Sequence, residues 1–301
     1  MSRKPATTVT TISARSSKHP LLVLYSALAL VAIAGGALAQ DAKRGLYLSK
    51  AAGCVGCHTE TRPNAQPYAG GRALNTPFGT FFGPNITPHP RAGIGHWSER
   101  DFIKAMRLGV RPDGAHYYPA FPYTSFTKIT DFDLKDLWAY LRSLPPSSRA
   151  SQPHDLKFYV RWRFPLWGWK LLFFSPGPFV PAPSRNAILN RGAYLVQALG
   201  HCGECHTPRN WLGAPKKDRF LAGAKLGEKI KAPNLTPTRL KKLSDAELKD
   251  ILRTGMTADG DVLAESMAEV VQNTTSQLTP QDLDALIAYL RSLPPLPEEP
   301  R

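Results

Sequence analysis

The feature that most constrains this chain is a five-residue motif, Cys-x-x-Cys-His, which occurs twice. It stands at residues 54–58 and again at residues 202–206. Two thiols three positions apart can form thioethers to the two vinyl groups of one porphyrin, and the imidazole that follows can then bind the iron. The motifs therefore predict two covalently bound haem c groups, held by Cys54, Cys57 and His58 and by Cys202, Cys205 and His206.

Two other uses of paired cysteines, a redox dithiol and a zinc site, compete with haem attachment. The chain has only four cysteines, and the two motifs use all of them. No thiol remains for a disulfide or for a zinc site elsewhere. Haem attachment is therefore the favoured interpretation.

The similarity between the two copies extends beyond the motifs. Arg-Gly-x-Tyr precedes each motif, at 44–47 and 191–194, and Pro-Asn-(Ile/Leu)-Thr-Pro follows, at 84–88 and 233–237. Each copy then predicts a helix that begins after a capping serine and ends at a glycine, and a last helix that a proline pair stops. This agreement indicates two homologous, mostly helical domains, at 41–150 and 186–301.

The first 39 residues differ in character from the rest. Four cations precede an uncharged apolar run of 19 residues, and Ala37-Leu38-Ala39 fits a cleavage site. We expect a signal peptide at 1–39, which agrees with haem attachment after export. The alternative is an uncleaved anchor, because the apolar run is near the length that spans a bilayer.

The chain is strongly basic, with a formal net charge of +15. The first 39 residues hold four of the cations and no acid, so the remainder keeps +11. An exported haem protein with this charge is expected to meet an acidic redox partner or an anionic membrane surface rather than nucleic acid. The plainer alternative is that the charge only keeps the protein soluble.

A linker at 151–185, rich in aromatic residues and proline, separates the two domains. It contains Trp162, Trp167 and Trp169, flanked by arginine and lysine. We expect these rings to pack across the domain interface and to cover haem edges, because several prolines preclude one long amphipathic helix. The alternative is contact with a membrane interface or a partner.

The axial position opposite the histidine decides whether a haem iron carries electrons or binds a small molecule. In the second domain Met267 lies seven positions after Gly260, in a predicted loop before the last helix. We expect Met267 to be the distal ligand of the iron that His206 binds. The same offset from Gly114 leads to Phe121, which cannot bind iron.

Three alternatives remain for the first haem. His116 lies in the corresponding loop and is a candidate ligand. Met106 is a second candidate, although its place on a helix face is typical of a core residue. The third alternative is an open iron. His89 and His96 are looser candidates, because they are more typical of exposed loop residues than of ligands.

Three further stretches complete the pattern: Gly-His-Cys-Gly-Glu-Cys-His-Thr-Pro-Arg-Asn at 200–210, Tyr-Pro-Ala-x-Pro-Tyr at 118–123 and Met-Ala-Glu-Val-Val at 267–271. With them the sequence resembles the cytochrome c subunits of membrane-associated bacterial alcohol, gluconate and aldehyde dehydrogenases. The resemblance implies a mainly α fold of two tandem class I cytochrome c-like domains. It also implies His58 and His206 as proximal ligands and Met267 as a distal one.

Two departures from that family limit what can be carried over. Those subunits typically carry three haem motifs, whereas this chain has two. They also usually have methionine where Phe121 stands, so the family's ligand does not transfer to the first haem. The chain therefore fits a shorter diheme relative whose donor dehydrogenase stays open.

The resemblance implies a diheme electron carrier in the periplasm, with attachment to the outer face of the cytoplasmic membrane as a further expectation. Such a protein is not an enzyme by itself. It accepts electrons from a periplasmic or membrane-bound dehydrogenase and passes them to a quinone, a cytochrome or an oxidase. The alternative is a catalytic diheme cytochrome, peroxidase-like or oxidising sulfur compounds, with an open or His-ligated first haem.

Overall fold

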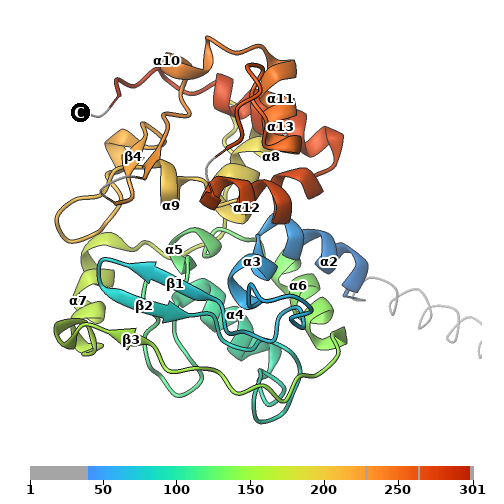
Figure 1. Ribbon diagram of the computed structural model, residues 1–301, viewed down its shortest axis with the longest axis vertical. Helices are drawn as coiled ribbons and strands as arrows, with labels where there is room; N and C mark the ends of the chain where they lie inside the picture. Colours follow the sequence, from blue (N-terminus) through green and yellow to red (C-terminus); the bar gives the residue numbers. More distant parts are fainter. Residues whose placement is uncertain (1–39, 228–229, 264, 299–301) are drawn as a thin grey trace, which may run out of the picture. The chain divides into compact units, whose positions relative to one another are not determined.

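In the computed structural model, which describes residues 40–227, 230–263 and 265–298, the two copies of the repeat fold alike (Figure 1). The predicted signal peptide at 1–39 lies outside the described residues. The first copy contains α2 (Ala42–Ala51), α3 (Cys54–His58), α4 (Glu99–Leu108), α5 (Tyr123–Phe126) and α6 (Asp131–Ser143). The second contains α8 (Ala187–Tyr194), α9 (Gly203–His206), α10 (Pro237–Leu240), α11 (Asp245–Thr254), α12 (Glu265–Asn273) and α13 (Pro280–Arg291).

Each domain is built on a close crossing of its first and last long helices, α2 with α6 and α8 with α13. A Cβ atom on Gly45 would lie 2.0 Å from the carbonyl oxygen of Asp136, and one on Gly192 would lie 1.9 Å from that of Ala285. Only glycine allows the two backbones to approach this closely. The repeated Arg-Gly-x-Tyr stretch therefore fixes the helix crossing in both domains.

The matching helices α4 and α11 begin and end as the sequence predicts. Ser98 and Ser244 cap their first turns, and each forms a capping box with the acid three residues later. Gly109 and Gly255 follow their last turns with φ of 60° and 76°, in the left-handed region that favours glycine. These local signals hold each helix at the same place in its domain.

Small sheets distinguish the domains. In the first, β1 (Ala73–Thr76), β2 (Gly79–Phe82) and β3 (Asp155–Leu156) form an antiparallel sheet in the order β1-β2-β3. The second has only the antiparallel pair β4 (Ala224–Lys225) and β5 (Lys231–Ala232) among its described residues. The hairpin of β1 and β2 lies in the loop between His58 and Pro84, which are 26 positions apart. His206 and Pro233 are 27 positions apart, so the two loops differ in structure and not in length.

The linker contains the helix α7 (Phe164–Phe173), with Pro165 in its first turn. Trp169 Nε1 donates a hydrogen bond to the carbonyl of Leu212, at 3.0 Å, so one ring does reach the second domain. The prediction that the rings pack across the interface is wrong for Trp162 and Trp167, which are mostly exposed. The short helix turns its rings to different sides, and only some of them face protein.

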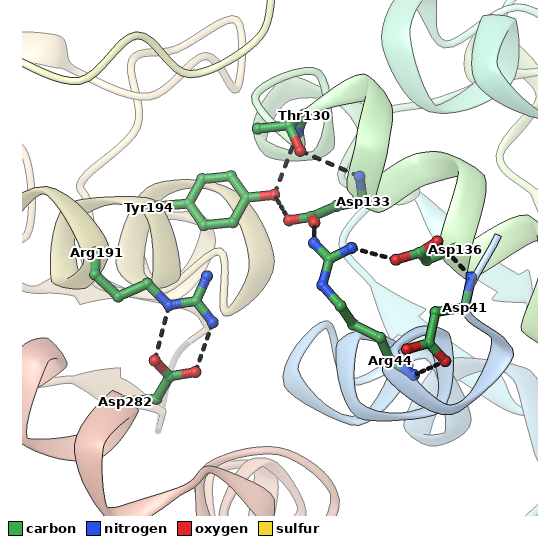
Figure 2. A network of polar contacts seen from close by, with 8 residues as sticks. All are labelled: Asp41, Arg44, Thr130, Asp133, Asp136, Arg191, Tyr194 and Asp282. Carbon is green, nitrogen blue, oxygen red and sulfur yellow. Dashed lines mark hydrogen bonds and ion pairs between the residues drawn. The ribbon is translucent and has the colours of Figure 1, made fainter. Parts of the chain in front are cut away.

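The described residues from Asp41 onward form one compact unit, in which the two domains exchange equivalent contacts. Tyr194 donates its hydroxyl hydrogen bond to Asp133 of the first domain (Figure 2). Tyr47 donates in the same way to Asp282 of the second domain. Each tyrosine oxygen also accepts a hydrogen bond from the backbone N–H of the residue that caps the facing helix. The distance is 3.2 Å from Thr130 to Tyr194 and 3.3 Å from Thr279 to Tyr47. Reciprocal contacts of this kind are typical of a two-fold arrangement.

An arginine supports each of these carboxylates from within its own domain. Arg44 forms ion pairs with Asp133 and Asp136, and Arg191 donates to both oxygens of Asp282 at 2.7 and 2.6 Å (Figure 2). Burial opposes ionisation of Asp282, but hydrogen bonds from Arg191 and Tyr47 leave its pKa below the usual value.

No described helix has both the length and the apolar sequence needed to span a bilayer.

Candidate haem-binding sites

The two motif histidines have the same environment. His58 Nδ1 lies 2.7 Å from the carbonyl oxygen of Pro84, and His206 Nδ1 lies 2.7 Å from that of Pro233. A carbonyl can only accept, so Nδ1 carries the proton and Nε2 has the free lone pair. Burial lowers the pKa of both imidazoles, which keeps them neutral. Both histidines therefore present the tautomer that an iron ligand requires.

The Pro-Asn-x-Thr loops hold these carbonyls in place. The Asn85 side chain accepts from Thr87 and donates to the carbonyls of Ser147 and Arg149, which follow the last helix of the domain. Asn234 repeats the arrangement with Thr236 and the carbonyl of Leu296. Each loop thereby holds the proline carbonyl that accepts from the Nδ1 of the motif histidine.

The motif thiols do not have the properties of a redox dithiol. Burial raises the pKa of Cys54 to about 11 and that of Cys202 to about 12, and it also raises the pKa of Cys57 and Cys205. Reactive dithiols instead have a lowered thiol pKa. All four cysteines are free, and the described residues hold no group of three or more His, Cys, Asp or Glu side chains placed to bind a metal ion. The geometry thus argues against a zinc site.

The residues present fit a haem c in each domain. Each motif supplies two unpaired thiols on one short helical turn and an imidazole with a free Nε2. Arg72 Nε, beside the first motif, is a buried donor that has no protein partner among the described residues. An unpartnered buried donor of this kind is expected next to a group that protein atoms do not supply.

Met267 lies in the first turn of α12, where the sequence predicts a loop. Met267, Val270 and Val271 share one face of this helix by their spacing, and Val271 is buried. Met267 itself is half-buried. Its role as the distal ligand of the second haem stays a prediction.

The first domain has an aromatic cluster at the corresponding position. Phe121 packs against Tyr117, Tyr123 and Phe126, with ring centroids 5.1, 6.5 and 5.7 Å away. Met106 is buried in the hydrophobic core on α4, as expected for a core residue. Phe121, at the sequence offset that Met267 has in the other domain, thus packs among aromatic rings and offers no group able to bind iron.

His116 lies in a short hairpin that both domains contain. It pairs with Val110, as Val262 pairs with Met256 in the second domain. His116 is thus equivalent to Val262 and not to Met267. It lines a cavity of about 520 Å³ together with linker residues, and its buried Nδ1 has no protein partner among the described residues. His116 as a haem ligand stays a prediction, whereas His89 and His96 make hydrogen bonds within their own loop.

The first motif packs against the helix that carries Met267. Helix α3 contacts α12, and a Cβ on Gly56 would lie 3.4 Å from the Asn273 side chain. Two residues after Met267, Glu269 accepts from Arg72 of the first domain, at 2.7 and 2.8 Å. Burial raises the pKa of Cys57, Arg72 lowers it, and the charges of Glu269 and Cys205 raise it. The first attachment helix therefore lies against the segment that carries Met267 and Glu269.

The second motif makes the reciprocal contact. Glu204, between its two cysteines, accepts from the hydroxyls of Thr124 and Ser125 at 2.6 and 2.7 Å. Both hydroxyls belong to the α5 region, directly after Phe121. Each attachment segment is thus bound to the distal segment of the other domain. Sequence reasoning missed Arg72, Glu269 and Glu204 as interface residues, because their partners are far away in the chain.

Comparison with known sequences supports this assignment of the two sites. A model of the cytochrome c family matches the chain twice, over residues 42–145 and 189–294. The chain belongs to the cytochrome c family. The prediction of a mainly α fold with two tandem cytochrome c domains is confirmed, as are two covalently bound haem c groups.

Individual relatives in the cytochrome c family agree with the predicted resemblance. A diheme cytochrome c-type protein of Cereibacter sphaeroides is 43% identical over 295 residues, covering 90% of this chain and 98% of that protein. The fructose dehydrogenase cytochrome subunit of Gluconobacter japonicus is 42% identical, covering 83% of this chain. The cytochrome c subunit of the quinone-dependent alcohol dehydrogenase of Gluconacetobacter polyoxogenes is 37% identical, covering 92%.

The chain matches only part of the dehydrogenase subunits that it resembles. It spans 52% of the fructose dehydrogenase subunit and 62% of the alcohol dehydrogenase subunit. The relatives are cytochrome subunits of dehydrogenases, which supports electron transfer and a dehydrogenase as a partner.

Proposed function

We propose that this protein is a periplasmic diheme cytochrome c that transfers electrons from a partner dehydrogenase toward the respiratory chain. The observation that carries the proposal is that the two attachment motifs meet at one interface. Helix α3 packs on α12, and Glu204 of the second motif accepts hydrogen bonds from the α5 region. Haem c, once attached, supplies reversible one-electron chemistry at each site. A short separation between the two attachment sites favours electron transfer within one molecule.

The axial groups give the transfer a direction. A thioether from Met267 raises the reduction potential of the second site relative to one without methionine. Phe121 cannot make this contribution in the first domain. Electrons therefore enter through the first domain and leave through the second, toward a quinone, a cytochrome or an oxidase.

Two features of the chain support export to the periplasm. The first is the signal-like sequence at 1–39, which lies outside the described residues. The second is the pair of Cys-x-x-Cys-His motifs, since covalent haem attachment of this type in bacteria follows export. The residues after 39 also keep a formal net charge of +11, which suits an acidic redox partner.

The proposal is tested by reducing the purified haem-loaded protein in stages and recording its visible spectrum. We expect two one-electron steps, with the site that shows a methionine-to-iron band reduced first. The protein should also be reduced by a membrane-bound dehydrogenase supplied with its substrate, and it should turn over no substrate alone. A single two-electron step, or a Met267 site reduced last, would contradict the proposed direction.

The catalytic alternative rests on Phe121, which leaves the first site without a methionine ligand. It predicts that cyanide or carbon monoxide changes the spectrum of the first haem and that the protein reduces peroxide or oxidises a sulfur compound without a partner. If neither ligand binds and no such substrate is consumed, the catalytic function is excluded.

A further inference from the structure

The linker and a neighbouring loop expose a group of large apolar side chains on the surface of the molecule. We call this group the aromatic surface; its members and their exposed fractions are Trp162 (78%), Phe164 (84%), Trp167 (59%), Leu171 (73%), Leu172 (70%) and Trp211 (90%). Single exposed apolar residues are common, but a group containing three tryptophans marks a binding surface. The proposed electron transfer does not account for this group.

Two contacts fix the orientation of α7, so that its exposed residues face away from the protein. The buried Lys170 donates from Nζ to the carbonyls of Leu108 and Gly109, at 2.7 Å each. The preceding residue, Trp169, donates from Nε1 to the carbonyl of Leu212, which follows Trp211 in the chain. The helix is therefore held against both domains, and Trp211 belongs to a loop that α7 contacts.

The chain segment that carries most of the aromatic surface has charge of only one sign. No aspartate or glutamate occurs from Leu156 to Gly203. The same stretch contains Lys157 and Arg161, which are exposed, and Arg163, which is half-buried. A protein interface usually has a rim of mixed polar groups. A surface of tryptophan, phenylalanine and leucine on a segment whose only charged side chains are cations instead matches an anionic lipid headgroup layer.

We propose that the aromatic surface binds the anionic surface of a lipid bilayer. The rings and leucines enter the interfacial layer, where tryptophan is favoured, and the cations contact lipid phosphates. Helix α7 has ten residues, which is too short to cross a bilayer, so it lies in the plane of the interface. This binding is independent of the proposed electron transfer and of residues 1–39.

The test measures amide hydrogen exchange of the full haem-loaded protein with and without vesicles. The vesicles contain equal parts of phosphatidylglycerol and phosphatidylcholine, or phosphatidylcholine alone. We expect exchange in the segment 158–174 to slow several-fold with the anionic vesicles, and this protection to weaken at high salt. The readout is local, so it holds whether or not residues 1–39 also reach the bilayer.

Two variants of the aromatic surface and one control make the test specific. Trp162→Ser/Phe164→Ser/Trp167→Ser should reduce vesicle affinity by about tenfold or more. Leu171→Ser/Leu172→Ser should reduce it by a smaller factor. The matched control, Met256→Ser/Val262→Ser, removes two exposed apolar residues of the second domain and should leave vesicle affinity unchanged. The visible haem spectrum verifies that each variant folds.

Three results would overturn the proposal. The first is equal protection by neutral and anionic vesicles, which would remove the role of the cations. The second is protection that appears without lipid as the protein concentration rises, which would assign the surface to a second copy of the chain. The third is protection by a dehydrogenase but not by vesicles, which would assign it to a protein partner.

Discussion

The first and second domains share their main helices and histidine contacts but differ in the segment that is predicted to supply the distal ligand. Both cross two helices at a glycine, and both fix the motif histidine with a proline carbonyl. They differ where Phe121 stands in one and Met267 in the other. In each case this segment is bound by the attachment helix of the opposite domain. The comparison indicates that the residue at this position can differ between the domains, because contacts with the opposite domain hold the segment in place in both.

The largest expected effect comes from removing the predicted ligand of the second site. Met267→Ala should abolish the methionine-to-iron charge-transfer band and lower one reduction potential by roughly 0.2 V, within the ~0.8 V range that axial ligands span. Met256→Ala is the matched control, because Met256 is 51% exposed and its loss should change neither quantity. Visible spectra and a potentiometric titration measure both. A band that persists in the Met267 variant would refute the assignment.

The converse substitution would make the two domains alike. Phe121→Met places a thioether at the position equivalent to Met267, and it should add a second charge-transfer band and raise the lower potential by roughly 0.1 V. Phe121→Leu is the control, since it alters the aromatic cluster without adding a ligand. His116→Ala made alongside tests the remaining candidate. If the spectrum of the first haem is unchanged in that variant, His116 is not its ligand.

Much of the frame could be predicted because its signals are local. The capping serines, the terminal glycines and the Pro-Asn-x-Thr loops each act within a few residues of their own position, so repetition in the sequence reveals them. The loop predicted around Met267 is a helix in the structure. The stretch before it, with Val262, Leu263 and Ala264, offers no capping residue or proline that would announce a helix start.

The contacts between domains could not be predicted, because nothing local signals them. Arg72 and Glu269 are separated by 197 positions. One motif does contain a hint: Glu204 occupies the position that Gly56 has in the other copy, and only the carboxylate can bind the α5 hydroxyls. The exposure of the linker rings could not be predicted either, because the presence of aromatic residues in a sequence does not show whether their rings are buried or exposed.

The ion pair between the domains tests whether electrostatics or packing couples the sites. Glu269→Gln removes a negative charge near Cys57 and should raise the first potential, whereas Arg72→Gln removes a positive charge and should lower it, by roughly 50 mV each. Both variants should also lose about 1 kcal/mol of stability. Glu298→Gln is the control, because Glu298 is 60% exposed and lies 4.0 Å from Arg239. Potential shifts of the same sign would show that packing dominates.

The smallest effects test the two-fold equivalence of the tyrosine contacts. Burial raises the pKa of Tyr47 and Tyr194, so both hydroxyls remain protonated donors. Tyr47→Phe and Tyr194→Phe each remove one bond to a carboxylate and leave one backbone N–H without an acceptor, at a cost of about 1–2 kcal/mol. The arginine beside each carboxylate stays in place, so the remaining charge keeps a partner.

Urea unfolding of the haem-loaded protein measures these losses. Equal losses for the single variants, adding in the double variant, are expected if the contacts are equivalent and independent. A loss confined to Tyr194→Phe would show that only the contact with Asp133 secures the interface. In that case the two contacts would be equivalent in backbone geometry but unequal in their contribution to the free energy of unfolding.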